Sequence, residues 1–183
     1  PDDADAMVAF VQDQDLRMLC SMLGASNHDV YDEFYSMAQT PGIYMVDFQL
    51  YDIEGGAKVT ICGRRQKKID AVATRLGKRC LAVQGDITNE KDRREAVEAA
   101  VKHGGKLDVL ISNAGNMVRG EIDTLKEDPL VDIFKTNVIA GMLLTGLCKP
   151  HLAKQGGAII FIGSIHTRRA FPGASAYAAT KGA

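Results

Sequence analysis

The sequence lacks the features that mark metal sites, nucleic-acid surfaces and membrane anchors. Its four cysteines are scattered without paired C-x-x-C spacing, so we expect no bound metal. The 22 basic and 23 acidic residues leave a formal net charge of -1, which gives no electrostatic attraction to nucleic acid or to an anionic membrane. No uninterrupted apolar run approaches the length of a membrane span, and the acidic start is unlike a secretory signal. We therefore expect neither nucleic acid nor a membrane as a partner.

The cysteines also bear on the cellular compartment. Three of the four lie in apolar segments, which is typical of free thiols in a reducing environment. This pattern predicts a cytoplasmic protein. The 183 residues suit one domain with an appendage, and a hydrophobic content of 46% is enough for a hydrophobic core.

Residues 55–183 show a regular alternation of short apolar runs and longer amphipathic stretches. The runs predict buried strands at 58–62, 80–83, 107–111 and 157–163. The stretches predict helices at 65–76, 88–102 and 129–152, the last interrupted near Pro150, and a further helix from about Ser175. Strands that alternate with helices of this length form βαβ units with a parallel sheet. The predicted fold class is therefore α/β, with functional loops at the carboxyl ends of the strands.

Residues 1–54 do not follow this alternation and are interpreted as an atypical, mostly helical N-terminal segment. Acidic residues favour a helix start, and apolar residues then recur at roughly helical spacing. The acidic residues are Asp2, Asp3 and Asp5, and the apolar ones are Met7, Val8, Phe10, Val11, Met18, Leu19, Met22 and Leu23. Residues 43–53 are ambiguous between strand and helix. The predicted division is thus an N-terminal segment at 1–54 and a core domain at 55–183.

Two residues near the end of the chain suggest acid/base chemistry. Tyr177 and Lys181 are four residues apart in an alanine-rich stretch after Pro172-Gly173, so a helix there would place both on one face. An ammonium close to a phenol lowers the phenol pKa from its ordinary value of about 10 and allows proton exchange with an alcohol or carbonyl oxygen. Ser164, at the end of the predicted strand 157–163, could orient the same oxygen.

The loop that follows Ser164 carries further polar side chains. His166, Arg168 and Arg169 could line a substrate entrance, or they could be part of a solvated loop. We favour the solvated loop, because charged and polar loop residues are most often exposed to water.

The order and spacing of several motifs resemble those of the classical short-chain dehydrogenase/reductases. They are Asn113-Ala114-Gly115 after the predicted strand at 107–111, Asn137 on the next helix, Ser164 after 27 more residues, Tyr177 after 13 more, and Lys181 after four more. The resemblance covers residues 55–183. It implies a Rossmann-like, doubly wound parallel sheet, which is incomplete here because the family continues past Lys181 with further elements. On that ground we expect the sequence to be a fragment of a longer chain.

The resemblance implies a role for each of these residues. Tyr177 would be the general acid/base, and Lys181 would lower its pKa and hold the nicotinamide ribose. Ser164 would hydrogen-bond the substrate oxygen, and Asn137 would support a water that links Lys181 to solvent. Asn113-Ala114-Gly115 would pack against the adenosine side of the cofactor. The implied reaction is hydride transfer between a nicotinamide and the carbinol carbon of a small-molecule alcohol or ketone.

The choice of cofactor depends on the residues after the predicted strand 58–62, which should lie beside the adenosine ribose. A carboxylate there would favour NAD(H). This chain has Arg64 and Arg65 instead, and guanidinium groups pair well with a phosphate. The sequence therefore predicts NADP(H), with NAD(H) less favoured, unless both arginines are simply a solvated helix start. Asp86-Ile87 resembles the family's adenine contact after the third strand.

One part of the family pattern is missing from this sequence. The first strand of the family leads into a glycine-rich turn, T-G-x-x-x-G-x-G, where the pyrophosphate approaches the backbone. The two degenerate candidates are Leu23-Gly24-Ala25-Ser26 and Thr40-Pro41-Gly42-Ile43-Tyr44. Side chains replace glycines in both, and these side chains should block close approach of the phosphates.

Three readings of function follow from this pattern. The first is an NADP(H)-dependent oxidoreductase that interconverts a secondary alcohol and a ketone. The second is a catalytically silent Rossmann-like binding or oligomerisation protein. The third is a truncated family member without a function of its own. The helices at 129–152 and from Ser175 are the family's usual dimerisation elements, so the resemblance also implies a homo-oligomer.

Overall fold

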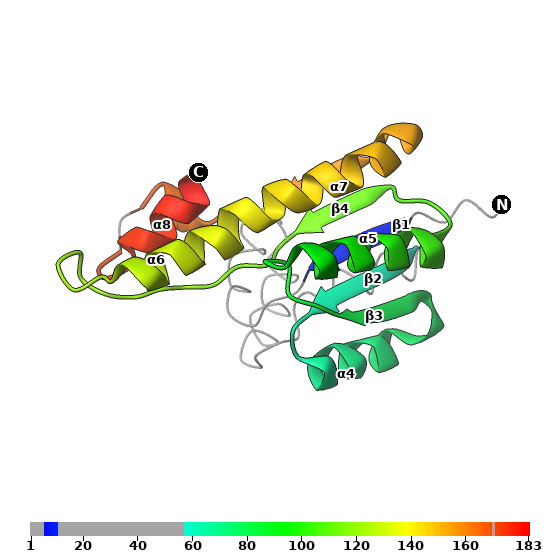
Figure 1. Ribbon diagram of the computed structural model, residues 1–183, viewed down its shortest axis with the longest axis horizontal. Coiled ribbons are helices and arrows are strands. Elements are labelled where there is room, and N and C mark those ends of the chain that lie inside the picture. The colour runs from blue at the N-terminus through cyan, green and yellow to red at the C-terminus, as the bar shows by residue number, and fades with distance from the viewer. Residues whose placement is uncertain (1–5, 11–56, 170) are drawn as a thin grey trace, which may run out of the picture.

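The computed structural model describes residues 6–10, 57–169 and 171–183, which form a parallel five-stranded sheet with helices packed against it (Figure 1). The strands are β1 (Ala6–Phe10), β2 (Lys58–Gly63), β3 (Cys80–Gln84), β4 (Val109–Ser112) and β5 (Ala158–Phe161). Their order across the sheet is β3-β2-β1-β4-β5. The strand order reverses beside β1, and in open α/β sheets ligands bind at the carboxyl ends of the strands at such a point.

Strand β1 lies where the sequence analysis predicted a helix. Met7, Val8 and Phe10 belong to a strand, so the helix expected there is wrong, and the remainder of the N-terminal segment lies outside the described residues. Met7 pairs with Val59 on one side and with Val109 on the other. A five-residue apolar run fits a buried parallel strand as well as a helix turn, and only pairing with distant strands decides between them.

The helices confirm the predicted alternation with one exception. They are α4 (Gln66–Leu76), α5 (Glu90–Gly104), α6 (Glu127–Phe134), the π-helical turn η3 (Lys135–Ile139), α7 (Ala140–Gln155) and α8 (Ser175–Gly182), with short 3-10 turns η2 (Gly77–Arg79) and η4 (Ile165–Thr167). The expected interruption near Pro150 is wrong, because Pro150 lies inside α7. Proline removes one backbone hydrogen bond, but Cys148 and Leu152 on either side of it are buried, and their packing keeps the helix intact.

Helix α5 begins and ends within two residues of the predicted bounds at 88 and 102. The Asn89 side chain caps its start by accepting from the backbone N–H groups of Lys91 and Asp92. Gly105 ends it in the left-handed region at φ 80°, where glycine carries no Cβ penalty. These two caps define the ends of helix α5.

The long helix formed by α6, η3 and α7 bears on the expectation of no membrane partner. By length and composition alone, Glu127–Gln155 could cross a membrane. Its most apolar stretch has a mean hydropathy of 1.4, and 28% of that stretch is buried in the structure. The expectation of no membrane partner rested on the lack of a long uninterrupted apolar run. The hydropathy of this helix is instead an average over apolar, polar and charged residues. One face of it packs on the sheet through Ala140, Leu144 and Leu152. Core helices of layered folds pass the same test, so this is weak evidence for a membrane.

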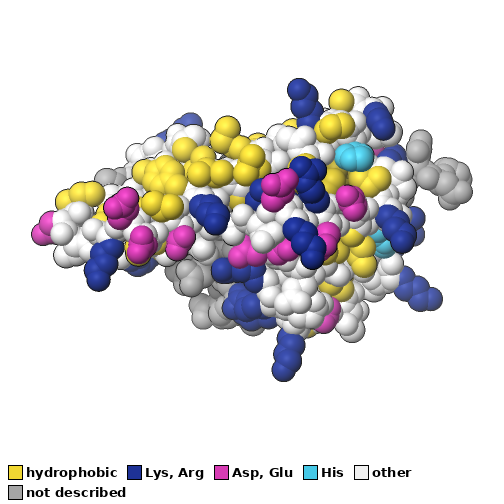
Figure 2. Space-filling model, viewed as in Figure 1, with side chains coloured by type: hydrophobic (Ala, Val, Ile, Leu, Met, Phe, Trp, Pro, Cys, Tyr) yellow, Lys and Arg dark blue, Asp and Glu magenta, His cyan; other side chains and the backbone are white. Residues whose placement is uncertain are grey.

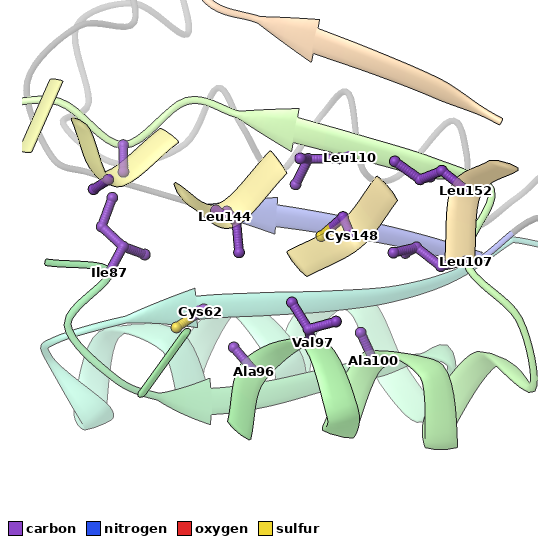
Figure 3. Close-up of a cluster of buried hydrophobic side chains, with 12 residues drawn as sticks. Cys62, Ile87, Ala96, Val97, Ala100, Leu107, Leu110, Leu144, Cys148 and Leu152 are labelled. Carbon is purple, nitrogen blue, oxygen red and sulfur yellow. The ribbon is translucent and has the colours of Figure 1, made fainter. Parts of the chain in front are cut away.

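Two hydrophobic clusters lie on opposite faces of the sheet. The larger cluster joins α5 and α7 to the sheet (Figure 3) and contains Cys62, Ile87, Ala96, Val97, Ala100, Leu107, Leu110, Ala114, Ala140, Leu144, Cys148 and Leu152. The smaller cluster joins Ile69 of α4 to Val59, Ile61 and Ile111. Successive residues of β2 therefore point to opposite faces, as the two-residue period of a strand requires. This arrangement confirms the predicted doubly wound α/β fold.

Candidate active site

The predicted site residues fall into two groups at the carboxyl ends of the strands. Asn113, Ala114 and Gly115 follow β4, and Ser164 follows β5 closely. Asn137 lies in the π-helical turn η3, and Tyr177 and Lys181 lie on α8. These residues form the first group. The second group follows β2 and β3, on the other side of β1, and contains Arg64, Arg65, Asp86 and Ile87.

Asn137 joins three separate segments of the first group. Its Oδ1 accepts from the backbone N–H of Asn116 at 2.6 Å, and its Nδ2 donates to the carbonyl of Asn116 at 2.9 Å. The same Nδ2 lies 2.9 Å from Oγ1 of Thr180 on α8. Asn137 stands in the middle of the π-helical turn, and such turns within α-helices are frequent at functional sites. The amide therefore fixes the loop after β4 and the last turn of α8 against η3.

Helix α8 presents one buried face to this site. Ala176, Tyr177 and Thr180 are buried, and Tyr177 is fully so. The Thr180 hydroxyl donates to the carbonyl of Tyr177 at 2.8 Å while it accepts from Asn137. The Asn137 amide is thereby connected to the turn of α8 that carries Tyr177.

Lys181 is held close to Tyr177. Its Nζ donates to the carbonyl of Ile162 at 2.8 Å and lies 5.8 Å from the centroid of the Tyr177 ring. Ile162 directly follows β5, so this bond ties α8 to the end of that strand. The predicted pairing of phenol and ammonium on one helix is therefore present.

Gly115 occupies a place that a larger residue would fill. A Cβ at this position would lie 3.5 Å from Nζ of Lys181 and 3.4 Å from Oδ1 of Asn137. The absence of a side chain keeps the loop after β4 close to both groups. The glycine of the Asn-Ala-Gly motif thereby lies close to the lysine.

Ser164 is buried, and its hydroxyl is held by the residue two positions later. Its Oγ accepts from the backbone N–H of His166 at 3.1 Å and lies 3.0 Å from Nδ1 of the His166 ring. The carbonyl of Ser164 accepts from the Thr167 hydroxyl at 2.8 Å. These bonds belong to the 3-10 turn η4 and set the direction of the serine side chain.

His166 corrects the expectation of a wholly solvated loop. It is half-buried, and its ring contacts two aromatic rings, with centroid distances of 4.4 Å to Phe171 and 5.1 Å to Tyr177. The Tyr177 contact is edge-on, with an interplanar angle of 89°. Arg168 and Arg169 are exposed, as a solvated loop predicts. The spacing of two residues after Ser164, together with the 3-10 turn, is the signal that would have pointed to the histidine.

The second group of predicted residues surrounds the ends of β2 and β3. Arg64 and Arg65 are exposed, and the carbonyl of Arg64 accepts from the Gln84 side chain at 3.0 Å. Helix α4 begins directly after them, with no acidic residue in its first turn. Positive side chains at the N-terminal end of a helix, where the helix dipole is also positive, favour an anion.

Asp86 and Ile87 form a tight turn after β3. The Asp86 carboxylate accepts from the backbone N–H and the hydroxyl of Thr88 at 2.9 and 2.8 Å. The Ile87 side chain lies in the large core cluster, and its carbonyl accepts from the buried Arg93 guanidinium at 2.6 Å. Hydrogen bonds at both residues therefore hold this turn in place.

The sequence after β1 lacks the glycines of the family's phosphate turn. Strand β1 ends at Phe10, and the next glycine in the chain is Gly24. Both degenerate glycine turns proposed from the sequence, at 23–26 and 40–44, lie outside the described residues.

The cysteines of the described residues are not suited to nucleophilic or metal chemistry. Burial, and then the nearby carboxylates of Asp92 and Asp86, raise the pKa of Cys62 to about 12. Burial alone raises the pKa of Cys148 to about 12 and that of Cys80 to about 11. Among the residues that the structure describes, no group of three His, Cys, Asp or Glu side chains could hold a metal ion.

Comparison with known proteins decides the family. The family model described as short chain dehydrogenase matches residues 51–183. The chain belongs to the short-chain dehydrogenase/reductase family. The predicted family and its Rossmann-like fold are thereby confirmed, whereas the role of each residue stays a prediction.

Among curated members of this oxidoreductase family, two illustrate the degree of similarity. Dehydrogenase/reductase SDR family member 4 of Caenorhabditis elegans is 34% identical over 135 residues, which cover 70% of this chain and 52% of the relative. An uncharacterised oxidoreductase of Methylorubrum extorquens is 36% identical over 133 residues, which cover 71% of this chain and 53% of the relative. The chain thus spans about half the length of the curated relatives that it matches.

Solved structures of short-chain dehydrogenase/reductases superpose on this chain. The 3-ketoacyl-(acyl-carrier-protein) reductase of Brucella melitensis, complexed with NADH, has a TM-score of 0.70 at 32% identity, covering 75% of this chain and 60% of its own. The KRED1-Pglu enzyme has a TM-score of 0.74 and covers 97% of this chain and 64% of its own. Its identity is 22%, so that likeness concerns the fold alone.

Proposed function

We propose that this chain carries the catalytic half of an NADP(H)-dependent oxidoreductase that interconverts a secondary alcohol and a ketone. The observation that carries the proposal is the linkage of the phenol and the ammonium to the sheet edge. Asn137 binds Thr180, Thr180 binds the Tyr177 carbonyl, and Lys181 binds the Ile162 carbonyl. A catalytic constellation needs this kind of support, because small displacements of the reacting groups are costly in rate.

In the proposed reaction the nicotinamide supplies or accepts the hydride, and the residues of this chain handle the proton. Tyr177 donates its phenolic proton to the oxygen of a ketone, or takes a proton from an alcohol. The Lys181 ammonium near the phenol ring favours the charged form of the tyrosine when the proton leaves. Ser164 donates a hydrogen bond to the same substrate oxygen, which stabilises the negative charge that develops there.

The described residues at this edge suit the nicotinamide-ribose end and the adenosine end of a nicotinamide dinucleotide. The missing Cβ of Gly115 leaves the backbone after β4 close to Lys181, which would hold the nicotinamide ribose. The turn at Asp86-Ile87 would meet the adenine, and Asn113-Ala114 would pack against the adenosine side. These assignments support a cofactor that crosses the sheet at the point where the strand order reverses.

Replacement of Tyr177 by phenylalanine tests the proposal. NADPH binding, followed by cofactor fluorescence and thermal stability, should be nearly unchanged in Tyr177→Phe, while ketone reduction should fall by about a thousandfold, since a lost general acid is worth about 10²–10⁴ in rate. If NADPH at millimolar concentration changes neither signal in the unmodified protein, the enzyme proposal fails.

The proposed preference for NADP(H) rests on Arg64 and Arg65. The Brucella melitensis structure is a complex with NADH, so NAD(H) is the alternative to be tested. The double change to alanine should raise the NADPH Kd by at least about tenfold, because a charge-assisted hydrogen bond contributes about 1.5–3 kcal/mol, and should leave NADH binding nearly unchanged. The exposed Lys102→Ala on α5 is the matched control. Equal NADPH affinity in both variants would contradict the preference.

A catalytically silent binding protein is the second candidate function. The observation that favours it is the absence of glycine between Phe10 and Gly24, directly after β1. Side chains there would keep the pyrophosphate away from the backbone donors that normally bind it. A protein of this kind would keep its fold and self-association while showing no change with NADPH or NADH.

We also propose self-association through the outer face of the long helix. Figure 2 shows hydrophobic side chains gathered over α6 and α7, and the exposed ones are Val131, Phe134, Ile139, Met142 and Leu143. Contiguous apolar surface of this kind marks an interaction site. Met142→Glu should shift the mass measured by light scattering towards the monomer, whereas the exposed Lys154→Glu should not. An unchanged mass in Met142→Glu would contradict this interface.

A further inference from the structure

Arg93 is a charged side chain on the buried face of α5. It shares that face with Ala96, Val97 and Ala100, which follow it at helical spacing, and only 6% of it is exposed. Its Nη1 donates to the carbonyl of Ile87 at 2.6 Å, whereas its Nε is buried without a hydrogen-bond partner. Within the described part of the chain, no carboxylate forms an ion pair with this guanidinium.

The packing of α5 does not require a charge at this position. Moving a guanidinium out of water is unfavourable, and a well-packed apolar side chain often stabilises a buried position as well as a charged one does. The helix dipole adds to the cost, because Arg93 lies near the N-terminal end of α5, where cations are disfavoured. The bond to the Ile87 carbonyl therefore points to a role of this arginine besides packing.

The carbonyl that Arg93 binds belongs to a turn after β3, which begins at Asp86 and ends at Asn89. The backbone N–H of Asn89 closes the turn by donating to the carbonyl of Asp86 at 2.8 Å. The residue before Arg93 binds the same turn, because Oδ2 of Asp92 accepts from the backbone N–H of Asp86 at 2.7 Å. Two successive residues of α5 thus hold two successive residues of the turn, one as acceptor and one as donor.

These bonds leave one donor and one acceptor of the turn for a ligand. Among the described residues, no hydrogen bond uses the backbone N–H of Ile87, and both bonds that the Asp86 carboxylate accepts from Thr88 end on Oδ1. An adenine offers the complementary pair, an amino group that donates and ring nitrogens that accept. A donor and an acceptor on neighbouring residues can bind one ring together only while the turn keeps a single shape.

We propose that Arg93 is a positioning residue for the cofactor, whose guanidinium holds the Ile87 carbonyl and so keeps the turn after β3 in the shape that receives the adenine. This inference rests on the proposed function, because it needs a dinucleotide at this edge of the sheet. It extends that function, because the residue that shapes the adenosine side comes from the buried face of α5. Loss of Arg93 should weaken binding of the adenosine end and leave proton transfer at Tyr177 unchanged.

Arg93→Met and Arg94→Met form a matched pair for cofactor binding. Both remove one positive charge from neighbouring positions of α5, but the Arg94 guanidinium is exposed and pairs with Glu90 at 2.7 Å. Arg93→Met should raise the NADPH Kd by about tenfold, the effect of roughly one hydrogen bond, and Arg94→Met should leave it nearly unchanged. Arg93→Lys keeps a charged donor and should restore part of the affinity. Equal Kd values in the two methionine variants would overturn the inference.

A cofactor without adenosine separates positioning from a general loss of structure. Reduced nicotinamide mononucleotide keeps the nicotinamide and its ribose but has no group that reaches the turn after β3. Ketone reduction with this mononucleotide should be equally fast in Arg93→Met and Arg94→Met, and kcat at saturating NADPH should also be equal in the two. An equal fall with both cofactors in Arg93→Met would mean that Arg93 supports the whole site, and would overturn the positioning role.

A third measurement needs no cofactor. Amide hydrogen exchange, followed for each residue by NMR, reports how often a local structure opens. The amides of Thr88 and Asn89 are bonded to Asp86 within the turn, and in Arg93→Met they should exchange about tenfold faster relative to the amide of Ile61 in β2. Unchanged relative exchange would overturn the inference. If the turn responds in this way and NADPH does not bind to the unmodified protein, the proposed function fails while the hold of Arg93 on the turn stands.

Discussion

The amide of Asn137 offers the most direct test of how the site is held together. Changing Asn137 to alanine removes three hydrogen bonds, two to the backbone of Asn116 and one to Thr180. At about 1 kcal/mol each, the loss in free energy of unfolding should be about 3 kcal/mol. The Thr180 hydroxyl is buried and still donates to the Tyr177 carbonyl, so water cannot easily replace the lost partner. Urea unfolding followed by circular dichroism measures this loss.

A double-mutant cycle separates the bond to Thr180 from the other two. Thr180→Val should be destabilising by itself, and its combination with Asn137→Ala should fall short of additivity by about 1 kcal/mol, because both changes remove the same bond. Asn89→Ala is the comparison variant, since its two cap bonds are exposed and should be worth about 1 kcal/mol. Additive effects, or a smaller loss for Asn137→Ala than for Asn89→Ala, would refute the reasoning.

Two further predictions concern packing and ionisation. Gly141→Ala should lower the free energy of unfolding by about 1–3 kcal/mol, because the added Cβ would lie 2.8 Å from Ser112 Oγ. In Gly146→Ala, on the same helix, the added Cβ meets nothing within 4 Å, so this change should raise the free energy of unfolding by about 0.5–1 kcal/mol. Equal effects of the two changes would contradict this prediction. Burial raises the pKa of Cys148 from 9.0 to about 12, so above pH 9.0 the unfolded thiol loses its proton first, and this thiol alone should lower the free energy of unfolding by about 1.4 kcal/mol per pH unit. The fall, measured in urea, should be smaller in Cys148→Ala, and an equal fall would refute the cause.

The regular part of the chain could be predicted from its sequence because local patterns determine it. The strands β2 to β5 and the helices α4 to α8 follow apolar runs and amphipathic stretches whose ends carry caps such as Asn89 and Gly105. The spacing of Asn137, Ser164, Tyr177 and Lys181 suggested the family, and the family model confirmed it. The local pattern and the family spacing of the motifs agree here, which is why the fold could be predicted from the sequence.

The predictions that were wrong share one physical cause, because each concerns a segment whose structure depends on contacts with distant parts of the chain. Strand β1 is too short and too uniformly apolar for the periodicity of its residues to distinguish a strand from a helix. Its pairing with Val59 and Val109 depends on distant residues and cannot be predicted from the strand's own sequence. The contacts of His166 with Phe171 and Tyr177 depend on the fold of the loop after β5. The continuation of α7 through Pro150 depends on packing against the sheet, which outweighs a local preference.

The central place of β1 has a consequence for how the chain folds. This strand joins the pair β2-β3 to the pair β4-β5, and both of its partners lie far along the chain. Pairings of high sequence separation form late, because the loop-closure entropy must be overcome before they contribute. The two pairs of strands should therefore assemble first, and insertion of Ala6–Phe10 between them should be the slow, cooperative step. Until then each pair exposes an open edge, and Ala6–Phe10 is among the last segments to be secured in the sheet.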